Sequence, residues 1–198
     1  RHLGGLPDHC SMGRKTALPF LMLSELHLDE VVDPDGVGGV NKYEREIARL
    51  RLGETARKFV KGCRDYWTGV DYDGAIVALG GDIFSGDIHD ELTQTNEDTM
   101  LGSLDYWIDE MAAALALIVD EFGKVHVPVV VGNHGRTTRK PRSKLRARDN
   151  FDWFLGRALA RMFRDDDRTP FDVSDSCRCP NPVSSHTSIL THHSPAER

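Results

Sequence analysis

The sequence lacks any long apolar run. No stretch of its 198 residues approaches the roughly 20 consecutive apolar residues of a membrane-spanning helix, and residues 1–17 lack the apolar centre of a secretory signal. A cysteine framework is missing too, because the only close pair is one C-x-C. The four cysteines are Cys10, Cys63, Cys177 and Cys179. Small secreted domains space their cysteines differently, so we expect a cytoplasmic protein with free thiols and no membrane partner.

An excess of positive charge is also absent. The chain has 25 Lys and Arg against 31 Asp and Glu, which gives a net charge of −6. This balance argues against attraction of the whole surface to nucleic acid or anionic lipid, so phosphate binding would require a local basic patch or a bound metal. Internal repeats, low-complexity tracts and domain linkers are not apparent. The sequence therefore predicts an irregular lead over residues 1–17 and one domain over residues 18–198.

Three apolar runs of strand length each end abruptly in polar residues. The run over residues 18–23 leads into Ser24-Glu25-Leu26-His27, the run over 75–79 into Gly80-Gly81-Asp82, and the run over 125–131 into Gly132-Asn133-His134-Gly135-Arg136. A buried strand that delivers functional groups at its carboxyl end has this pattern.

Helical periodicity separates these runs. Asn41 is the expected N-cap of a first helix, whose apolar positions are Tyr43, Ile47, Leu50, Ala56, Phe59, Val60, Cys63 and Trp67. A second helix is predicted over residues 101–122, ended by Gly123, and a third begins near Asn150 and reaches Met162. Strands that alternate with helices predict an α/β fold with a mainly parallel sheet, which places ligands beyond the carboxyl ends of its strands.

The polar clusters contain carboxylate, imidazole and amide groups. The candidate residues are Glu25, His27, Asp82, Asn133, His134 and the later His192. This mixture suits Mn²⁺, Fe or Zn²⁺ better than an all-oxygen Ca²⁺ site. One such residue alone is more often a cap or a hydrogen-bonding group, so the prediction depends on all three clusters meeting at one edge of the sheet.

The same clusters carry a family resemblance. Glu25-Leu26-His27, Gly81-Asp82 and Gly132-Asn133-His134 resemble the D-x-H, G-D and G-N-H blocks of the calcineurin-like metallophosphoesterases. The similarity to phage-encoded members extends through residues 30–34, 80–92, 132–136 and 150–153. It implies a sandwich of β-sheets flanked by helices, and a hydrolase that cleaves phosphate esters with two divalent metal ions. Mn²⁺ is the favoured metal, with Fe or Zn²⁺ as alternatives.

The resemblance also implies a role for each ligand. Asp82 would bridge the two metals, Glu25 and His27 would serve the first, and Asn133 and His192 the second. A shared carboxylate suits two-metal chemistry, in which cations roughly 3.5 to 4 Å apart generate hydroxide and neutralise phosphate oxygens.

Other residues are predicted to contact the substrate. By resemblance, His134 would contact the scissile phosphate or protonate the leaving group. Arg136, Arg139, Lys140 and Arg142 belong to a basic stretch that directly follows the third cluster. This stretch either holds the backbone of DNA, RNA or a nucleotide phosphodiester, or is a solvated surface.

Three departures from the family pattern leave alternatives open. Glu25 stands where the family usually has Asp, Gly135 replaces an acidic residue common after G-N-H, and no G-H-x-H block occurs before Arg198. The expectation is therefore a domain truncated at its C-terminus. The alternative is a catalytically impaired phosphoesterase fold that binds nucleic acid.

A third possibility is an interaction module stabilised by zinc. Its ligands would come from Cys177, Cys179, His186, His192 and His193. A C-x-C followed by unevenly spaced histidines lacks the paired spacing usual for structural zinc sites, which makes this the weakest of the three hypotheses.

Overall fold

The computed structural model describes residues 15–67, 69–142 and 144–174. The elements are β1 (Lys15–Ala17), β2 (Phe20–Leu23), a 3-10 helix η1 (Pro34–Val37), α1 (Arg45–Lys61), a π-helical turn η2 (Gly62–Tyr66), β3 (Val70–Tyr72), β4 (Ala75–Leu79), α2 (Asp90–Thr95), α3 (Met100–Phe122), β5 (Val125–Val129), α4 (Phe151–Met162) and β6 (Phe171–Val173). The expected alternation of strands and helices is confirmed.

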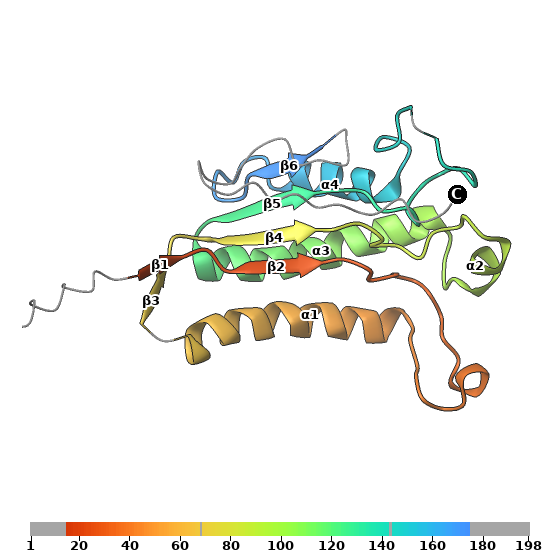
Figure 1. Cartoon of the computed structure of the whole chain (residues 1–198), viewed down its shortest axis with the longest axis horizontal. Coiled ribbons are helices and arrows are strands. Elements are labelled where there is room, and N and C mark those ends of the chain that lie inside the picture. Colours follow the sequence, from red (N-terminus) through yellow and green to blue (C-terminus); the bar gives the residue numbers. More distant parts are fainter. Residues whose placement is uncertain (1–14, 68, 143, 175–198) are drawn as a thin grey trace, which may run out of the picture.

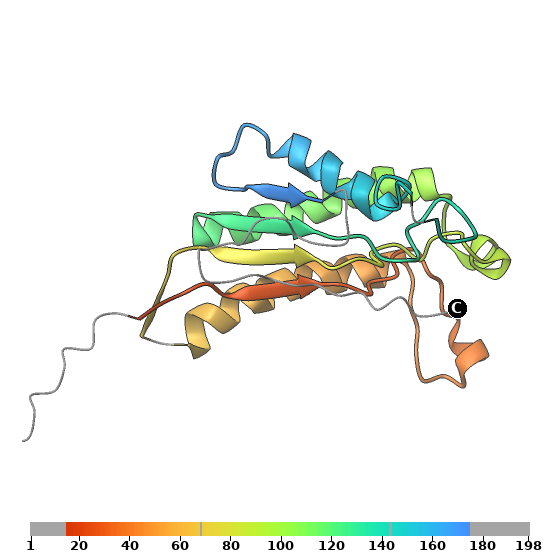
Figure 2. The same cartoon turned by 45° about the horizontal axis from the view of Figure 1, so that its top comes forward.

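The main sheet has four strands in the order β2-β4-β5-β6, and every neighbouring pair is parallel. The arrows β2, β4 and β5 point the same way in Figure 1, and the loops that follow them gather with α2 at that end of the molecule. A small second sheet pairs β1 with β3 at the opposite end (Figure 2). The predicted mixed α/β fold with parallel strands is therefore present.

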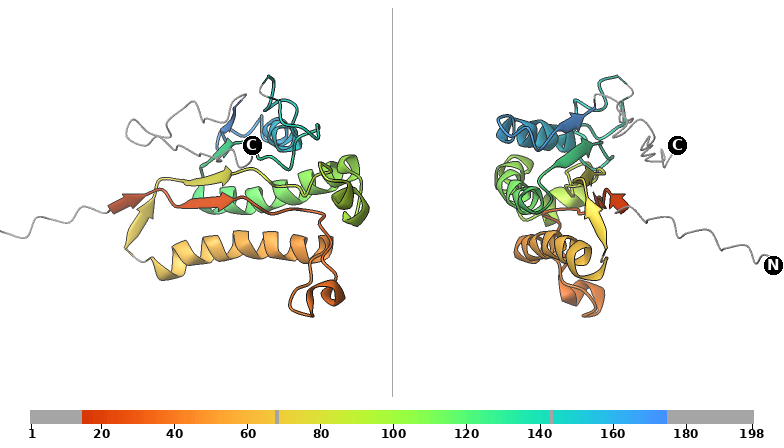
Figure 3. Two further views of the ribbon diagram at one scale, coloured as in Figure 1. Left: turned by 45° about the vertical axis from the view of Figure 1, so that its right-hand side comes forward. Right: turned by 90° about the vertical axis from the view of Figure 1, so that its left-hand side faces the viewer.

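Helices α1, α3 and α4 lie side by side on one face of the main sheet, as the end-on view in Figure 3 shows. The central helix α3 packs on β4 and β5 and also against α1. Its side chains Trp107, Met111 and Leu115 are fully buried. All of β4 is buried as well, and it lies between β2 and β5 in the centre of the sheet.

Several sequence predictions need correction. The irregular lead does not extend to Ala17, because residues 15–17 pair with β3. Asn41 does not cap α1. The helix begins at Arg45, whose backbone N–H donates to the Glu97 carboxylate, so the cap comes from a distant segment. Leu50, predicted to be on the apolar face of α1, is exposed.

The ends of the other two long helices were predicted correctly. Gly123 ends α3 with a left-handed φ of 70°, and its N–H donates to the carbonyl of Val119. Asn150 caps α4 by accepting a hydrogen bond from the N–H of Asp152. Cys63 is a buried free thiol, and the other cysteines lie outside the described residues. None of the helices described is both long enough and apolar enough to cross a membrane.

Candidate active site

The loop after β2 is joined to the loop after β4 beyond the ends of the two strands. The N–H of Glu25 donates to the carbonyl of Gly81 (3.2 Å), and the N–H of His27 donates to the carbonyl of Asp82 (3.2 Å). The parallel pairing of the strands thus continues into the loops. It brings two of the three predicted clusters together at the carboxyl edge of the sheet.

Both loops contain backbone conformations that side chains disfavour. Glu25 (φ 55°), His27 (φ 45°) and Asp82 (φ 49°) all lie in the left-handed region. Each costs on the order of 1 kcal/mol relative to an ordinary conformation, and such residues persist only where the surroundings fix them. Residues of this kind gather at functional sites, so the strain agrees with the predicted location of the site.

Three predicted side chains are in direct contact. His27 Nε2 lies 3.2 Å from Glu25 Oε2, and the His27 ring packs edge-on against the His134 ring with centroids 4.6 Å apart. The Glu25 side chain is 57% exposed and the His27 side chain 25% exposed, so the pair faces solvent. His89 reaches the same group, with its ring centroid 6.4 Å from that of His134.

Asp82, the next predicted ligand, is buried in the protein interior and only 2% exposed. Its Oδ1 accepts a hydrogen bond from the backbone N–H of His134 (2.6 Å), which attaches the loop after β5 to the loop after β4. The His134 ring is fixed as well, because Nδ1 lies 2.9 Å from the carbonyl oxygen of Ser85. A carbonyl only accepts, so Nδ1 carries the proton, and Nε2 is the nitrogen available to a ligand.

A residue without a predicted role, Asp152, holds these loops together from below. Its Oδ2 accepts hydrogen bonds from the backbone N–H of Asp82 (3.1 Å) and of Gly132 (3.0 Å), and its Oδ1 accepts from the N–H of Ile83 (3.2 Å). Burial raises the pKa of Asp152 to about 6, and the nearby Asp82 charge adds to the rise, while the three N–H donors oppose it. The sequence signal was an aspartate at the start of α4, but this is also a common helix-start residue.

Asn150 and Asp152 explain the glycine at position 135. A Cβ on Gly135 would lie 2.5 Å from Asn150 Oδ1 and 3.0 Å from Asp152 Cγ. The space of an acidic side chain at this position is thus already occupied by two others. The glycine at this position is a consequence of how α4 begins.

Position 81 requires glycine for a different reason. Gly81 adopts a φ of 91°, and a Cβ on it would lie 2.5 Å from the backbone nitrogen of Gly132. The two loops therefore approach each other backbone to backbone, which only glycine permits. This close approach places the clusters after β4 and β5 next to each other.

Arg136 is turned back onto its own loop. Its guanidinium donates to the carbonyls of Thr138 (2.8 Å), Arg139 (2.9 Å) and Asn133 (3.3 Å). Three of its five N–H donors are thus directed at backbone oxygens, and its predicted contact with substrate stays a prediction. Asn133 itself is exposed and directly precedes His134 in the chain.

The rest of the basic stretch is distributed unevenly. Arg139 forms an ion pair with Asp90 at the start of α2. Lys140 and Arg142 are exposed, and neither side chain has a carboxylate partner within residues 15–67, 69–142 and 144–174. Both side chains are therefore exposed cations of this stretch.

The described residues do not form a complete metal centre. They contain no group of three or more His, Cys, Asp or Glu side chains placed to hold one ion. Glu25 and His27 supply a pair of donors, with Asp82 and Asn133 nearby in the fold. His192, and the cysteines and histidines of the zinc hypothesis, lie outside the described residues.

Comparison of the chain with protein-family models, with curated proteins and with solved structures found no match. What the chain does must therefore be inferred from its own residues.

Proposed function

We propose that this chain is a calcineurin-like metallophosphoesterase that hydrolyses phosphodiesters of nucleic acids or nucleotides. The observation that supports this most strongly is the meeting of three loops. The loops after β2, β4 and β5 bring Glu25, His27 and His134 into contact above the buried Asp82. Parallel α/β sheets bind their ligands at this edge.

The donor types at this edge fit a transition metal. Glu25 and Asp82 offer carboxylates, His27 an imidazole and Asn133 an amide, and these four residues would hold the metal together with His192. Bound divalent ions would supply hydroxide and would neutralise the oxygens of the phosphate. On β2, Phe20 and Met22 are 44% and 48% exposed. We propose that a second β-sheet packs on this face of β2.

His134 is proposed to contact the phosphate and to protonate the leaving oxygen. Its Nδ1–H is engaged by the Ser85 carbonyl, and its backbone N–H by Asp82. The ring therefore has a fixed orientation, and a proton carried on Nε2 would be held in one place. A general acid needs such positioning in addition to a suitable pKa.

The exposed cations Lys140 and Arg142 support a polyanionic substrate. They follow the loop of His134 in the chain and have no carboxylate partner among the described residues. Such cations would neutralise phosphates, as a protein that binds a nucleic-acid backbone requires. A cavity of about 420 Å³ also borders Glu25 and His27, between the loop after β2 and helix α1. It has the size of a small-molecule pocket.

The test is a titration with Mn²⁺, followed by turnover of bis(p-nitrophenyl) phosphate, on the wild-type chain and three variants. Asp82→Asn should abolish metal-dependent turnover and weaken Mn²⁺ binding, because it removes a ligand charge at constant size. His134→Ala should lower turnover on the order of 100-fold, the usual contribution of a general acid, with Mn²⁺ binding retained. Asp109→Asn, an exposed carboxylate on α3, is the matched control and should behave as wild type.

Near-normal turnover of Asp82→Asn would refute the assignment. Equal losses of metal binding and turnover in His134→Ala would make His134 a ligand instead of an acid.

Two observations favour a second candidate, a catalytically impaired fold that binds nucleic acid. The described residues form no three-donor metal group, and Glu25 is engaged with His27. This candidate predicts DNA or RNA binding without Mn²⁺ and less than one bound Mn²⁺ per chain. Two bound ions with turnover would exclude it.

A further inference from the structure

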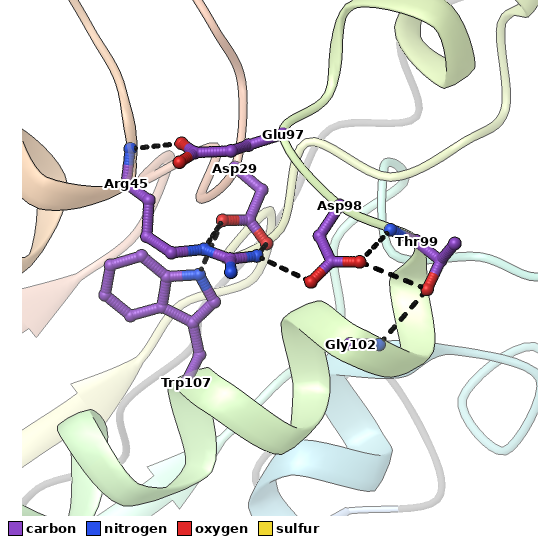
Figure 4. Close-up of polar contacts among 7 residues, drawn as sticks. All are labelled: Asp29, Arg45, Glu97, Asp98, Thr99, Gly102 and Trp107. Atoms are coloured by element: carbon purple, nitrogen blue, oxygen red, sulfur yellow. Dashed lines mark hydrogen bonds and ion pairs between the residues drawn. The ribbon is translucent and has the colours of Figure 1, made fainter.

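A buried aspartate anchors the far end of the loop that carries Glu25 and His27. Asp29 is 2% exposed and accepts three hydrogen bonds, drawn in Figure 4. Arg45 donates from Nε to Oδ1 (2.8 Å) and from one terminal nitrogen to Oδ2 (2.9 Å). Trp107 donates its Nε1–H to Oδ1 (3.1 Å).

The three residues come from separate elements. Asp29 belongs to the loop after β2, Arg45 is the first residue of α1, and Trp107 lies in α3, where its ring is fully buried. A planar guanidinium that meets a carboxylate with two parallel bonds fixes both position and angle. The loop is thereby attached to the helix layer, whose geometry is set by the core.

A neighbouring segment completes the attachment. Glu97 accepts the backbone N–H of Arg45 (2.7 Å) and donates its own N–H to the carbonyl of Asp29 (2.9 Å). Asp98 accepts a further bond from Arg45 (3.3 Å). The segment just before α3 is thus bonded both to Asp29 in the site loop and to Arg45 at the start of α1 (Figure 4).

The loop needs such an anchor. Residues 25, 27 and 29 all have a positive φ, with 69° at Asp29. Three left-handed residues within five cost roughly 3 kcal/mol together. Backbone bonds to Gly81 and Asp82 hold the first two. The third is held by the bond from the Glu97 N–H to its carbonyl and by the bonds to its carboxylate. Without the carboxylate, the loop could relax toward ordinary conformations, and the side chains of Glu25 and His27 would move with the backbone.

We propose that Asp29, through its bonds to Arg45 and Trp107, is a positioning residue that sets the placement of Glu25 and His27 for metal binding. This inference rests on the proposed function for its metal, but its structural part can be measured without metal. A side chain that merely stabilised the fold would change the unfolding temperature and leave the site geometry intact. A positioning residue must also change the environment of the His27 ring in the folded protein.

The test compares Asp29→Asn with Glu97→Ala. Asparagine tolerates a left-handed backbone and keeps an oxygen for Trp107, so the variant should fold, but it loses the paired bonds to Arg45. Glu97→Ala removes the cap of α1, which lowers stability, while the Asp29 carboxylate stays in place. The readouts are the ring signals of His27 and His134 in NMR spectra of the metal-free protein, the affinity for Mn²⁺, and the unfolding temperature.

We expect both variants to unfold at lower temperature than wild type. Only Asp29→Asn should shift the His27 ring signals, and it should weaken Mn²⁺ binding about tenfold, as loss of the groups that orient metal ligands does. Trp107→Phe serves as a second variant if Asp29→Asn does not fold. It keeps the ring packing and removes one donor, and it should shift the same His27 signals by a smaller amount.

Unchanged His27 signals in the folded Asp29 or Trp107 variant would overturn the inference, and so would equal Mn²⁺ affinities for Asp29→Asn and Glu97→Ala. Failure of the proposed function has a different signature. In that case the wild-type chain binds no Mn²⁺, while the His27 signals still respond to Asp29→Asn, and the positioning role stands.

Discussion

Replacing Asp152 with asparagine tests the polar centre that holds the site loops. The carboxylate accepts three backbone N–H groups, from Asp82, Ile83 and Gly132. The more favourable orientation of an asparagine amide keeps its oxygen on the N–H groups of Asp82 and Gly132. Its NH₂ group then faces the N–H of Ile83. One buried N–H then loses its acceptor, which costs about 1 to 3 kcal/mol, and two donors face each other.

An opposing effect comes from burial of the charge. The pKa of Asp152 is raised from 3.8 to about 6, first by burial and then by the Asp82 charge, against the pull of the N–H donors. Folding therefore destabilises the ionised carboxylate by about 3 kcal/mol more than it destabilises the protonated form, and at pH 7 the carboxylate is ionised in both the folded and the unfolded chain. Asparagine avoids this penalty. The two effects nearly cancel. The free energy of unfolding of Asp152→Asn should therefore lie within about 1 kcal/mol of the wild-type value at pH 7.

Acidification should separate the two proteins. The pKa of Asp152 is higher in the folded chain than in the unfolded chain, so the native state binds more protons between about pH 6 and pH 4. The contribution of Asp152 to the free energy of unfolding therefore increases as the pH falls through about 6. The Asp152→Asn variant lacks this contribution. The free energy of unfolding of wild type minus that of Asp152→Asn should grow by about 1.3 kcal/mol from pH 7 to pH 5.

The assay is urea unfolding of EDTA-treated protein at pH 7, 6 and 5, followed by circular dichroism. Asp109→Asn, on the exposed face of α3, is the control, and its difference from wild type should not change with pH. A difference for Asp152→Asn that stays constant over this range would refute the reasoning. It would mean that burial of Asp152 does not raise its pKa.

Two further predictions concern the loop after β5. Gly135→Asp should destabilise the chain by at least about 2 kcal/mol in the same unfolding assay, because its Cβ would overlap Asn150 and Asp152; a stability equal to wild type would mean that the start of α4 yields to a side chain. The double variant Lys140→Gln, Arg142→Gln should bind single-stranded DNA with a weaker salt dependence. The negative slope of log affinity against log salt concentration should become less steep by about 1.4. An unchanged slope would assign this exposed stretch to the solvated surface.

The parts of the fold that follow from local sequence were predictable. The run Ala75–Leu79 is continuously apolar, and it forms a central strand that is buried along its whole length. Gly123 ends α3 with a left-handed conformation, because no other residue adopts it so cheaply. In both cases the physical cause lies within a few residues of the position concerned.

The start of α1 was not predictable on the same basis. Asn41 is a better capping residue than Glu44 by intrinsic preference, yet α1 begins after Glu44. The reason is Glu97, which comes 52 residues after Arg45 and accepts the first N–H of the helix. Periodicity and propensity describe neighbours in the chain, so a cap provided by a distant loop leaves no trace in the local sequence.

In the candidate site, too, the types of residue could be predicted from the sequence, whereas their contact partners could not. The sequence predicts which polar groups follow the strands, and the structure brings Glu25, His27 and His134 into contact. It does not predict which groups are already satisfied. Arg136 appears in the sequence as one more cation near a phosphate site, but three backbone carbonyls occupy its guanidinium. These three bonds order the loop that carries Arg136, and within the described residues Lys140 and Arg142 are exposed cations without a carboxylate partner.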